Sequence, residues 1–152
     1  MNKIGVRSLF LLAEVTFSSN LCFFYTFTFL TIQKMPYNET FAIRIRNVFY
    51  EKNIDFTEKK MFSGICFMVD DKMCCGTHMD KKTNEDVLMC RIGEDEYEKA
   101  LENEHCIPME FTGKPMKGYV YVTENGLKKT SDLDYWLQLC LNYNPLAKKS
   151  KK

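Results

Sequence analysis

The chain has 152 residues, of which 45% are hydrophobic and 27% are charged, a balance typical of one globular domain and not of a disordered chain. Its formal net charge of +1 excludes the overall basic field that draws a protein to nucleic acid. Its seven cysteines are an odd number in a chain long enough to bury a core unaided, so we expect reduced thiols and a cytoplasmic location.

The charges are unevenly distributed along the chain. Residues 35–145 carry 14 basic and 19 acidic side chains, a balance of −5, whereas the segment 146–152 carries four lysines. We therefore expect a mildly acidic domain over residues 35–145, followed by a basic tail that is solvated, as charged termini usually are.

The first 34 residues differ in composition from the rest of the chain. Lys3 and Arg7 precede an apolar run, and residues 21–30 are intensely aromatic. A signal peptide needs a small-residue cleavage site, which does not follow the run, and a membrane anchor needs about 20 mostly apolar residues, which serines and threonines interrupt here. We favour a third interpretation, that residues 1–34 are a non-native or optional extension and that the native protein begins at Met35 or at the next residue.

The first predicted element of the domain is a helix over residues 38–51. Asn38 is a favourable N-cap, and Pro36 prevents the helix from beginning earlier. The apolar side chains fall at i, i+4, i+7 and i+8 and form one stripe. These are Phe41, Ile45, Val48 and Phe49.

A β-rich block follows this helix. The runs 65–69 and 73–79 are joined by the polar turn 70–72 and predict a hairpin, and 87–92 predicts a third strand after the charged loop 80–86. Strands that follow one another directly predict antiparallel pairing.

The second half of the domain begins with a short predicted helix over residues 94–103, whose first turn is acidic and so favours the helix dipole. Two more strands are predicted at 109–111 and 119–122. The segment 112–118 between them is predicted to be a loop.

The last predicted helix begins at Ser131 and ends at Asn144-Pro145. Ser131 can cap it, with Asp134 at the reciprocal position of a capping box. Its apolar stripe consists of Leu133, Trp136, Leu137, Cys140 and Leu141. The predicted order is α-β-β-β-α-β-β-α, which indicates a two-layer α+β domain with an antiparallel sheet.

Five stretches of the sequence resemble the TfoX/Sxy N-terminal domain family, and the resemblance as a whole covers residues 35 to about 145. They are residues 35–37, 57–69, 73–76, 88–93 and 108–122. The last stretch contains Pro-Met-Glu-Phe-Thr-Gly-Lys-Pro-Met-Lys-Gly-Tyr and is the most specific of the five.

This resemblance implies a two-layer α+β domain similar to secretion-chaperone folds. The founding members of the family are bacterial regulators of natural competence that act beside the cAMP receptor protein at a subset of its promoters, and they carry a second, helical domain. The resemblance therefore implies a regulatory module that contacts a protein of the transcription machinery.

A group of cysteines and one histidine is the candidate for a metal or redox site. Its members are Cys66, Cys74, Cys75, His78 and Cys90. Structural zinc requires paired C-x₂₋₄-C ligand sets, whereas adjacent Cys74 and Cys75 would point to opposite faces of a sheet. Only Cys74 and His78 remain as a half-site at i and i+4. We expect thiols packed in the core, with no bound metal or other cofactor.

The sequence shows no recognisable catalytic residue. Either histidine, His78 or His105, could act as a general base, but no nucleophile with a third orienting group accompanies it. The segment 113–118 superficially resembles a phosphate-binding loop, yet Pro115 removes a backbone donor and a strand follows where such a loop needs a helix.

Four lysines form the candidate binding surface, because loop residues on a rigid scaffold often carry binding. They are Lys59, Lys60, Lys114 and Lys117. We expect a non-enzymatic module that acts through protein contacts in transcription, with no membrane partner. Two alternatives remain open: direct DNA binding, which the acidic balance of the domain disfavours, and an enzyme acting on RNA, which the lack of cofactor motifs disfavours.

Overall fold

The computed structural model describes residues 37–61 and 63–149. These residues all belong to a unit that runs from Met35 to Lys152. The expectations about residues 1–34, including a native start at Met35, lie outside the described residues.

Helix α1 spans Glu39–Glu51, as the sequence predicts. The Asn38 side chain accepts a hydrogen bond from the backbone N–H of Phe41 at 3.3 Å, which satisfies one of the donors left free at a helix N-terminus. All four apolar residues of the predicted stripe are buried in the core.

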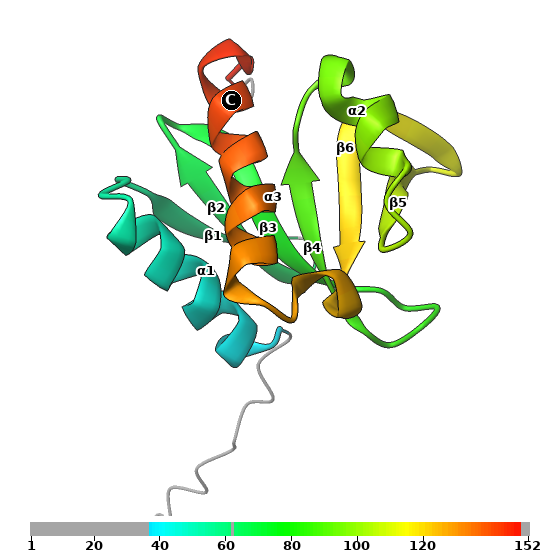
Figure 1. The fold of residues 1–152 in the computed structure, drawn as a ribbon, viewed down its shortest axis with the longest axis horizontal. Coiled ribbons are helices and arrows are strands. Elements are labelled where there is room, and N and C mark those ends of the chain that lie inside the picture. Colours follow the sequence, from blue (N-terminus) through cyan, green and yellow to red (C-terminus); the bar gives the residue numbers. More distant parts are fainter. Residues whose placement is uncertain (1–36, 62, 150–152) are drawn as a thin grey trace, which may run out of the picture. The chain divides into compact units, whose positions relative to one another are not determined.

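Six antiparallel strands form one sheet in the order β1-β2-β3-β4-β6-β5 (Figure 1). The strands are β1 (Thr57–Met61), β2 (Gly64–Val69), β3 (Lys72–Met79), β4 (Asp86–Arg91), β5 (Cys106–Phe111) and β6 (Lys114–Thr123). The predicted order lacked the first of these. All five residues of β1 are exposed, because β1 is an edge strand, so it shows no apolar alternation to detect.

The predicted loop over residues 112–118 is wrong for most of its length. Phe111 pairs directly with Lys114, so only Thr112 and Gly113 form the turn. Both have positive φ angles, 54° and 78°, which is the type I′ conformation that matches the twist of a hairpin. Lys114 and Lys117 are therefore strand residues.

Two further helices complete the domain, α2 (Glu94–Leu101) and α3 (Thr130–Tyr143). The predicted capping box at Ser131 and Asp134 is wrong, because α3 begins earlier, with Lys129 at the N-cap and no side-chain cap. A 3₁₀ turn also continues the chain past Tyr143 to Leu146. None of the described helices is long and apolar enough to cross a membrane.

The helices lie on one face of the sheet, as Figure 1 shows, which confirms the α+β class. The core between the two layers is aliphatic, aromatic and thiol-rich. Its largest fully buried side chains include Ile45, Phe49, Phe67, Leu88, Leu133 and Leu137.

Candidate interaction surface

The four candidate lysines form two separate pairs. Lys59 and Lys60 lie on β1, whereas Lys114 and Lys117 lie on β6. Strands β2, β3 and β4 separate β1 from β6, so the two pairs are about 19 Å apart across the sheet at 4.8 Å per strand step. The fold therefore does not bring these lysines into one basic patch.

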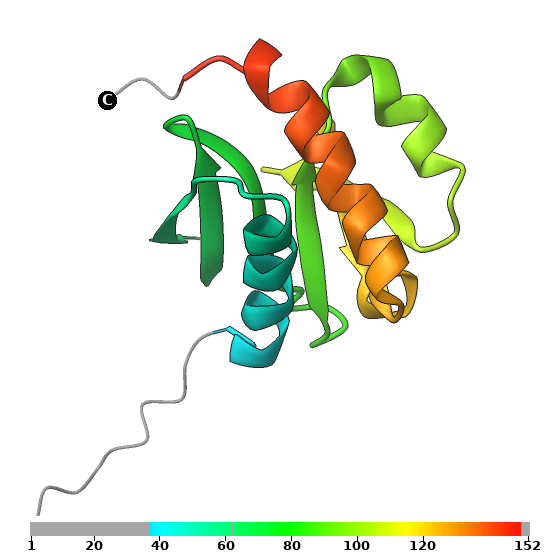
Figure 2. The ribbon, with the colours of Figure 1, turned by 60° about the vertical axis from the view of Figure 1, so that its left-hand side comes forward.

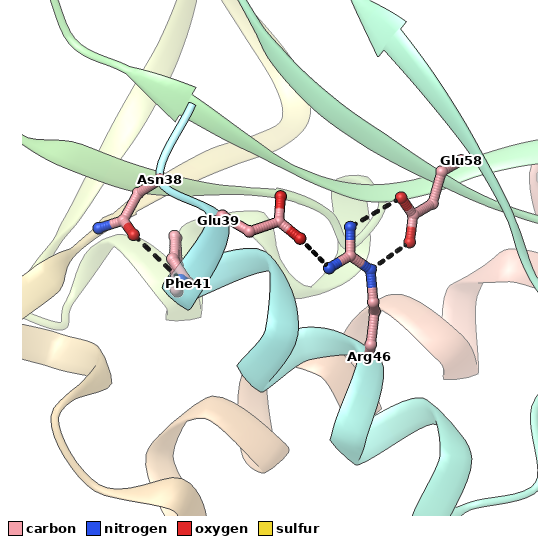
Figure 3. Close-up of polar contacts among 5 residues, drawn as sticks. All are labelled: Asn38, Glu39, Phe41, Arg46 and Glu58. Atoms are coloured by element: carbon pink, nitrogen blue, oxygen red, sulfur yellow. Dashed lines mark hydrogen bonds and ion pairs between the residues drawn. The ribbon is translucent and has the colours of Figure 1, made fainter. Parts of the chain in front are cut away.

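An ion-pair network fixes β1, the strand that carries Lys59 and Lys60, to α1 (Figure 3). Arg46 of α1 binds the Glu58 carboxylate of β1 through two contacts, Nε–Oε1 at 2.5 Å and NH2–Oε2 at 2.9 Å. The same guanidinium contacts Glu39 at 2.5 Å, and this hydrogen bond lowers the pKa of Glu39. The partners lie 7 and 12 residues from Arg46, so no local sequence pattern predicts the network.

The second pair lies on a projecting part of the hairpin, residues 109–118, which we call the β5–β6 arm. Strand β4 pairs with β6 only from Tyr119 onward, so Lys114 and Pro115 pair with β5 alone. The β5–β6 register shifts between Pro108 and Glu110, beside Lys117. Both Lys114 and Lys117 are exposed on this arm. Neither forms an ion pair with another described residue.

The base of the arm is held by two glycines. The backbone N–H groups of Ile92 and Gly93 both donate to the carbonyl oxygen of Gly118, at 3.0 and 3.1 Å. Gly118 has a φ of 83°, and a Cβ there would lie 3.1 Å from the Gly93 carbonyl carbon. The arm is therefore two-stranded at its tip but anchored to the sheet at its base.

The surroundings of the arm are acidic. Helix α2 packs against β6, and residues 94–104, which include α2, contain six acidic residues and one lysine. That lysine, Lys99, is paired with Glu96 at 4.0 Å. The two arm lysines are thus a small positive feature beside a strongly negative one.

The buried thiols are arranged differently from the prediction. Strand β3 shifts register against β2, because Phe67 pairs with Cys75 but Met68 pairs with Met73, so Cys74 is an extra residue in a bulge. Cys74 and Cys75 therefore do not point to opposite faces: both pack in the core, where Cys74 contacts Cys140 of α3. Cys140 also contacts Cys90.

The predicted half-site of Cys74 and His78 is also wrong. The His78 ring stacks on Tyr121, with centroids 5.4 Å apart, whereas Cys74 packs on α3. Among the described residues, no group of three or more His, Cys, Asp or Glu is placed to hold a metal ion. The other histidine, His105, lies 3.5 Å from Glu104 on the surface.

We predict that two of the buried thiols, Cys66 and Cys106, react very slowly in the folded protein. Burial raises the pKa of Cys66 and of Cys106 to about 12, so at pH 8 their thiolate fraction falls about 10³-fold below that of a free cysteine. Alkylation with iodoacetamide, followed by peptide mass spectrometry, measures each site in native and in urea-unfolded protein. Equal rates at Cys66 in the two states would contradict the prediction.

The fold defines a class: a small α+β domain with helices on one face of an antiparallel sheet and a projecting β-hairpin arm. The model of the TfoX N-terminal domain family matches residues 52–143, and the chain belongs to this family. The match begins after α1, so residues 35–51 lie outside it. No curated protein matches the chain. Family membership indicates a regulatory module connected with competence.

Proposed function

We propose that the chain is a non-enzymatic module of transcriptional regulation that contacts a protein of the transcription machinery through the β5–β6 arm. The observation that carries this proposal is the arm itself, a two-stranded projection with two exposed, unpaired lysines on a fixed base. A preorganised projection binds a partner without the entropic cost of ordering a loop.

Charge favours a protein over DNA as the partner of the arm. A two-stranded β-ribbon can enter the major groove of DNA, and this shape is what supports the alternative of direct DNA binding. The acidic residues of α2 lie beside the arm, however, and would repel the phosphates on either side of that groove. A protein surface with its own acidic and basic regions can complement both features.

We predict that the charge reversals Lys114→Glu and Lys117→Glu, made together, weaken partner binding about tenfold, or 1.4 kcal/mol. The probes are purified RNA polymerase and cAMP receptor protein from the native host, each titrated against the immobilised full chain. The matched control is Lys128→Glu with Lys129→Glu, which changes the net charge equally on the exposed segment before α3. The free energy of unfolding of both variants should lie within about 0.5 kcal/mol of that of the parent.

A salt series with duplex DNA distinguishes the alternative. Direct DNA binding predicts tight association by the full chain whose log affinity falls steeply with log salt concentration. Such binding, lost in the arm variant, would replace the protein-contact proposal. Equal partner binding by the arm variant and its control would remove the arm from the contact surface.

A further inference from the structure

A groove runs along the connection between α1 and β1. It consists of two adjacent hollows, of about 340 and 240 Å³, and Asp55 and Phe56 line both of them. It extends from Tyr50 at the end of α1 to the turn between β2 and β3. We call it the acidic groove, and it is lined by Tyr50, residues 53–57, Met68, Asp70 and Asp71.

One wall of the acidic groove is a fixed aromatic shelf. Tyr50 is 65% exposed, a large value for an aromatic side chain. Its ring lies 5.4 Å from that of Phe56, which in turn packs 5.3 Å from Phe49 and 5.8 Å from Phe67. The exposed ring therefore rests on rings that belong to the core, and a partner side chain could bind it at little entropic cost.

The other wall of the acidic groove is negative. Asp55, Asp70 and Asp71 line it, and the described lining residues include no lysine or arginine. Asp70 and Asp71 have φ angles of 51° and 61°, a type I′ turn that holds both residues in fixed positions. The groove thus combines an apolar shelf with three carboxylates, of which Asp55 and Asp70 have no ion-pair partner among the described residues.

The molecule already places one cation at the end of this groove. Lys149 lies 3.5 Å from the Asp71 carboxylate. The segment before it is held in place, since the Asn144 side chain donates to the Val69 carbonyl at 3.1 Å and Lys72 donates to the Asn144 carbonyl at 3.0 Å. Figure 2 shows the red end of this segment running from α3 toward the β2–β3 turn. A lysine side chain is therefore received at Asp71, while Asp55 and Asp70 have no ion-pair partner among the described residues.

We propose that the acidic groove docks a segment of a partner protein that places lysine or arginine beside an aromatic or aliphatic side chain. The cation would lie against Asp55 and Asp70, and the apolar side chain would lie on the Tyr50–Phe56 shelf. A nucleic acid or an acidic peptide would meet repulsion from the three aspartates. This surface is distinct from the β5–β6 arm and extends the proposed function by a second contact with a protein.

The test uses two probe peptides of opposite charge, acetyl-Lys-Phe-Lys-Phe-Lys-amide and acetyl-Glu-Phe-Glu-Phe-Glu-amide, titrated into the ¹⁵N-labelled full chain. The lysine peptide should shift the backbone amide signals of Asp55, Phe56 and Asp71, and the glutamate peptide should leave them unchanged. Shifts confined to the acidic helix α2, or equal shifts with both peptides, would overturn the proposal.

Variants make the test specific to the acidic groove. Asp70→Asn with Asp71→Asn keeps a turn that asparagine tolerates and should weaken lysine-peptide binding about tenfold. Tyr50→Ala should weaken it by a similar factor. The matched control, Glu94→Gln with Glu98→Gln, changes the net charge equally on exposed α2 and should bind as the parent does. Equal affinity of the groove variants and the control would overturn the proposal.

Two other occupants are distinguished by the same titration. If the chain's own basic tail fills the groove, the lysine peptide will shift these signals only in the variant Lys148→Gln with Lys149→Gln. If a second copy of the chain fills the groove, the signals will shift as the protein concentration rises, without any peptide. Either result would overturn the proposal that a partner segment occupies the acidic groove. The arm variant Lys114→Glu with Lys117→Glu should bind the lysine peptide normally, so failure of this proposal is separable from failure of the arm contact.

Discussion

Replacing Gly64 by alanine is expected to destabilise the domain by about 3 kcal/mol or more, enough to unfold much of a marginally stable protein. A Cβ at position 64 would lie 1.7 Å from the Thr77 carbonyl oxygen and 2.7 Å from its carbon, and both are backbone atoms of β3. The Thr77 hydroxyl accepts a hydrogen bond from Ile65 N–H at 3.1 Å, which holds the two strands at this close approach. Relief of the clash therefore requires β2 and β3 to separate.

Urea unfolding of the full chain, followed by far-ultraviolet circular dichroism, measures this loss. Gly113→Ala is the informative control, because a Cβ there meets no atom within 4 Å and only the positive φ of 78° opposes it. That strain costs about 1–2 kcal/mol. A Gly64 variant no less stable than the Gly113 variant would show that the strands adjust without cost.

Phe67→Ala is expected to destabilise the domain by about 3–5 kcal/mol, the range for removing a buried aromatic ring. Phe67 is fully buried in β2, and its ring lies 5.8 Å from those of Phe49 and Phe56. The ring thus joins the sheet, α1 and the α1–β1 connection at one point. The remaining cavity is lined by rings from separate elements, which limits how far it can collapse.

The same unfolding experiment measures the effect of Phe67→Ala. Ile107→Ala serves as its control, because Ile107 is 38% exposed on edge strand β5 and its truncation should cost less than about 1 kcal/mol. Similar losses for the two variants would contradict a central role for Phe67. Removal of the Phe67 ring is also expected to make the Tyr50 side chain more mobile, because Tyr50 rests on the ring of Phe56, which packs on Phe67.

The elements that bury a full apolar stripe could be predicted from the sequence, whereas edge structure could not. Helix α1 has both a stripe and the cap Asn38, and its predicted boundaries hold within one residue. Strand β1 lies on the edge of the sheet and exposes all of its side chains, so burial leaves no pattern in it. Residues 112–118 are predicted to be a loop, yet Pro115 lies in a strand, where proline is tolerated because β4 does not pair with this part of β6.

The candidate surfaces depend on contacts that no local pattern records. Alternation along a strand predicts opposite faces for Cys74 and Cys75, but the bulge arises from how β3 pairs with β2 and is set by both strands. The acidic groove likewise brings Asp55 and Asp70 together, although the two strands β1 and β2 lie between them in the sequence. The type I′ turn at Thr112-Gly113 is the exception, since glycine in its second position is a readable signal.

The exposed strand β1 has a consequence for how the protein behaves at high concentration. An edge strand presents free backbone donors and acceptors, which can template intermolecular β-pairing and aggregation. Here Arg46 fixes Glu58 on one side of the edge, and Lys59 and Lys60 place two positive charges along it. Two copies that met edge to edge would bring these lysines together in a solvent-poor interface. The same two residues that the sequence offers as a binding surface thus act as gatekeepers of solubility, whatever partner the domain has.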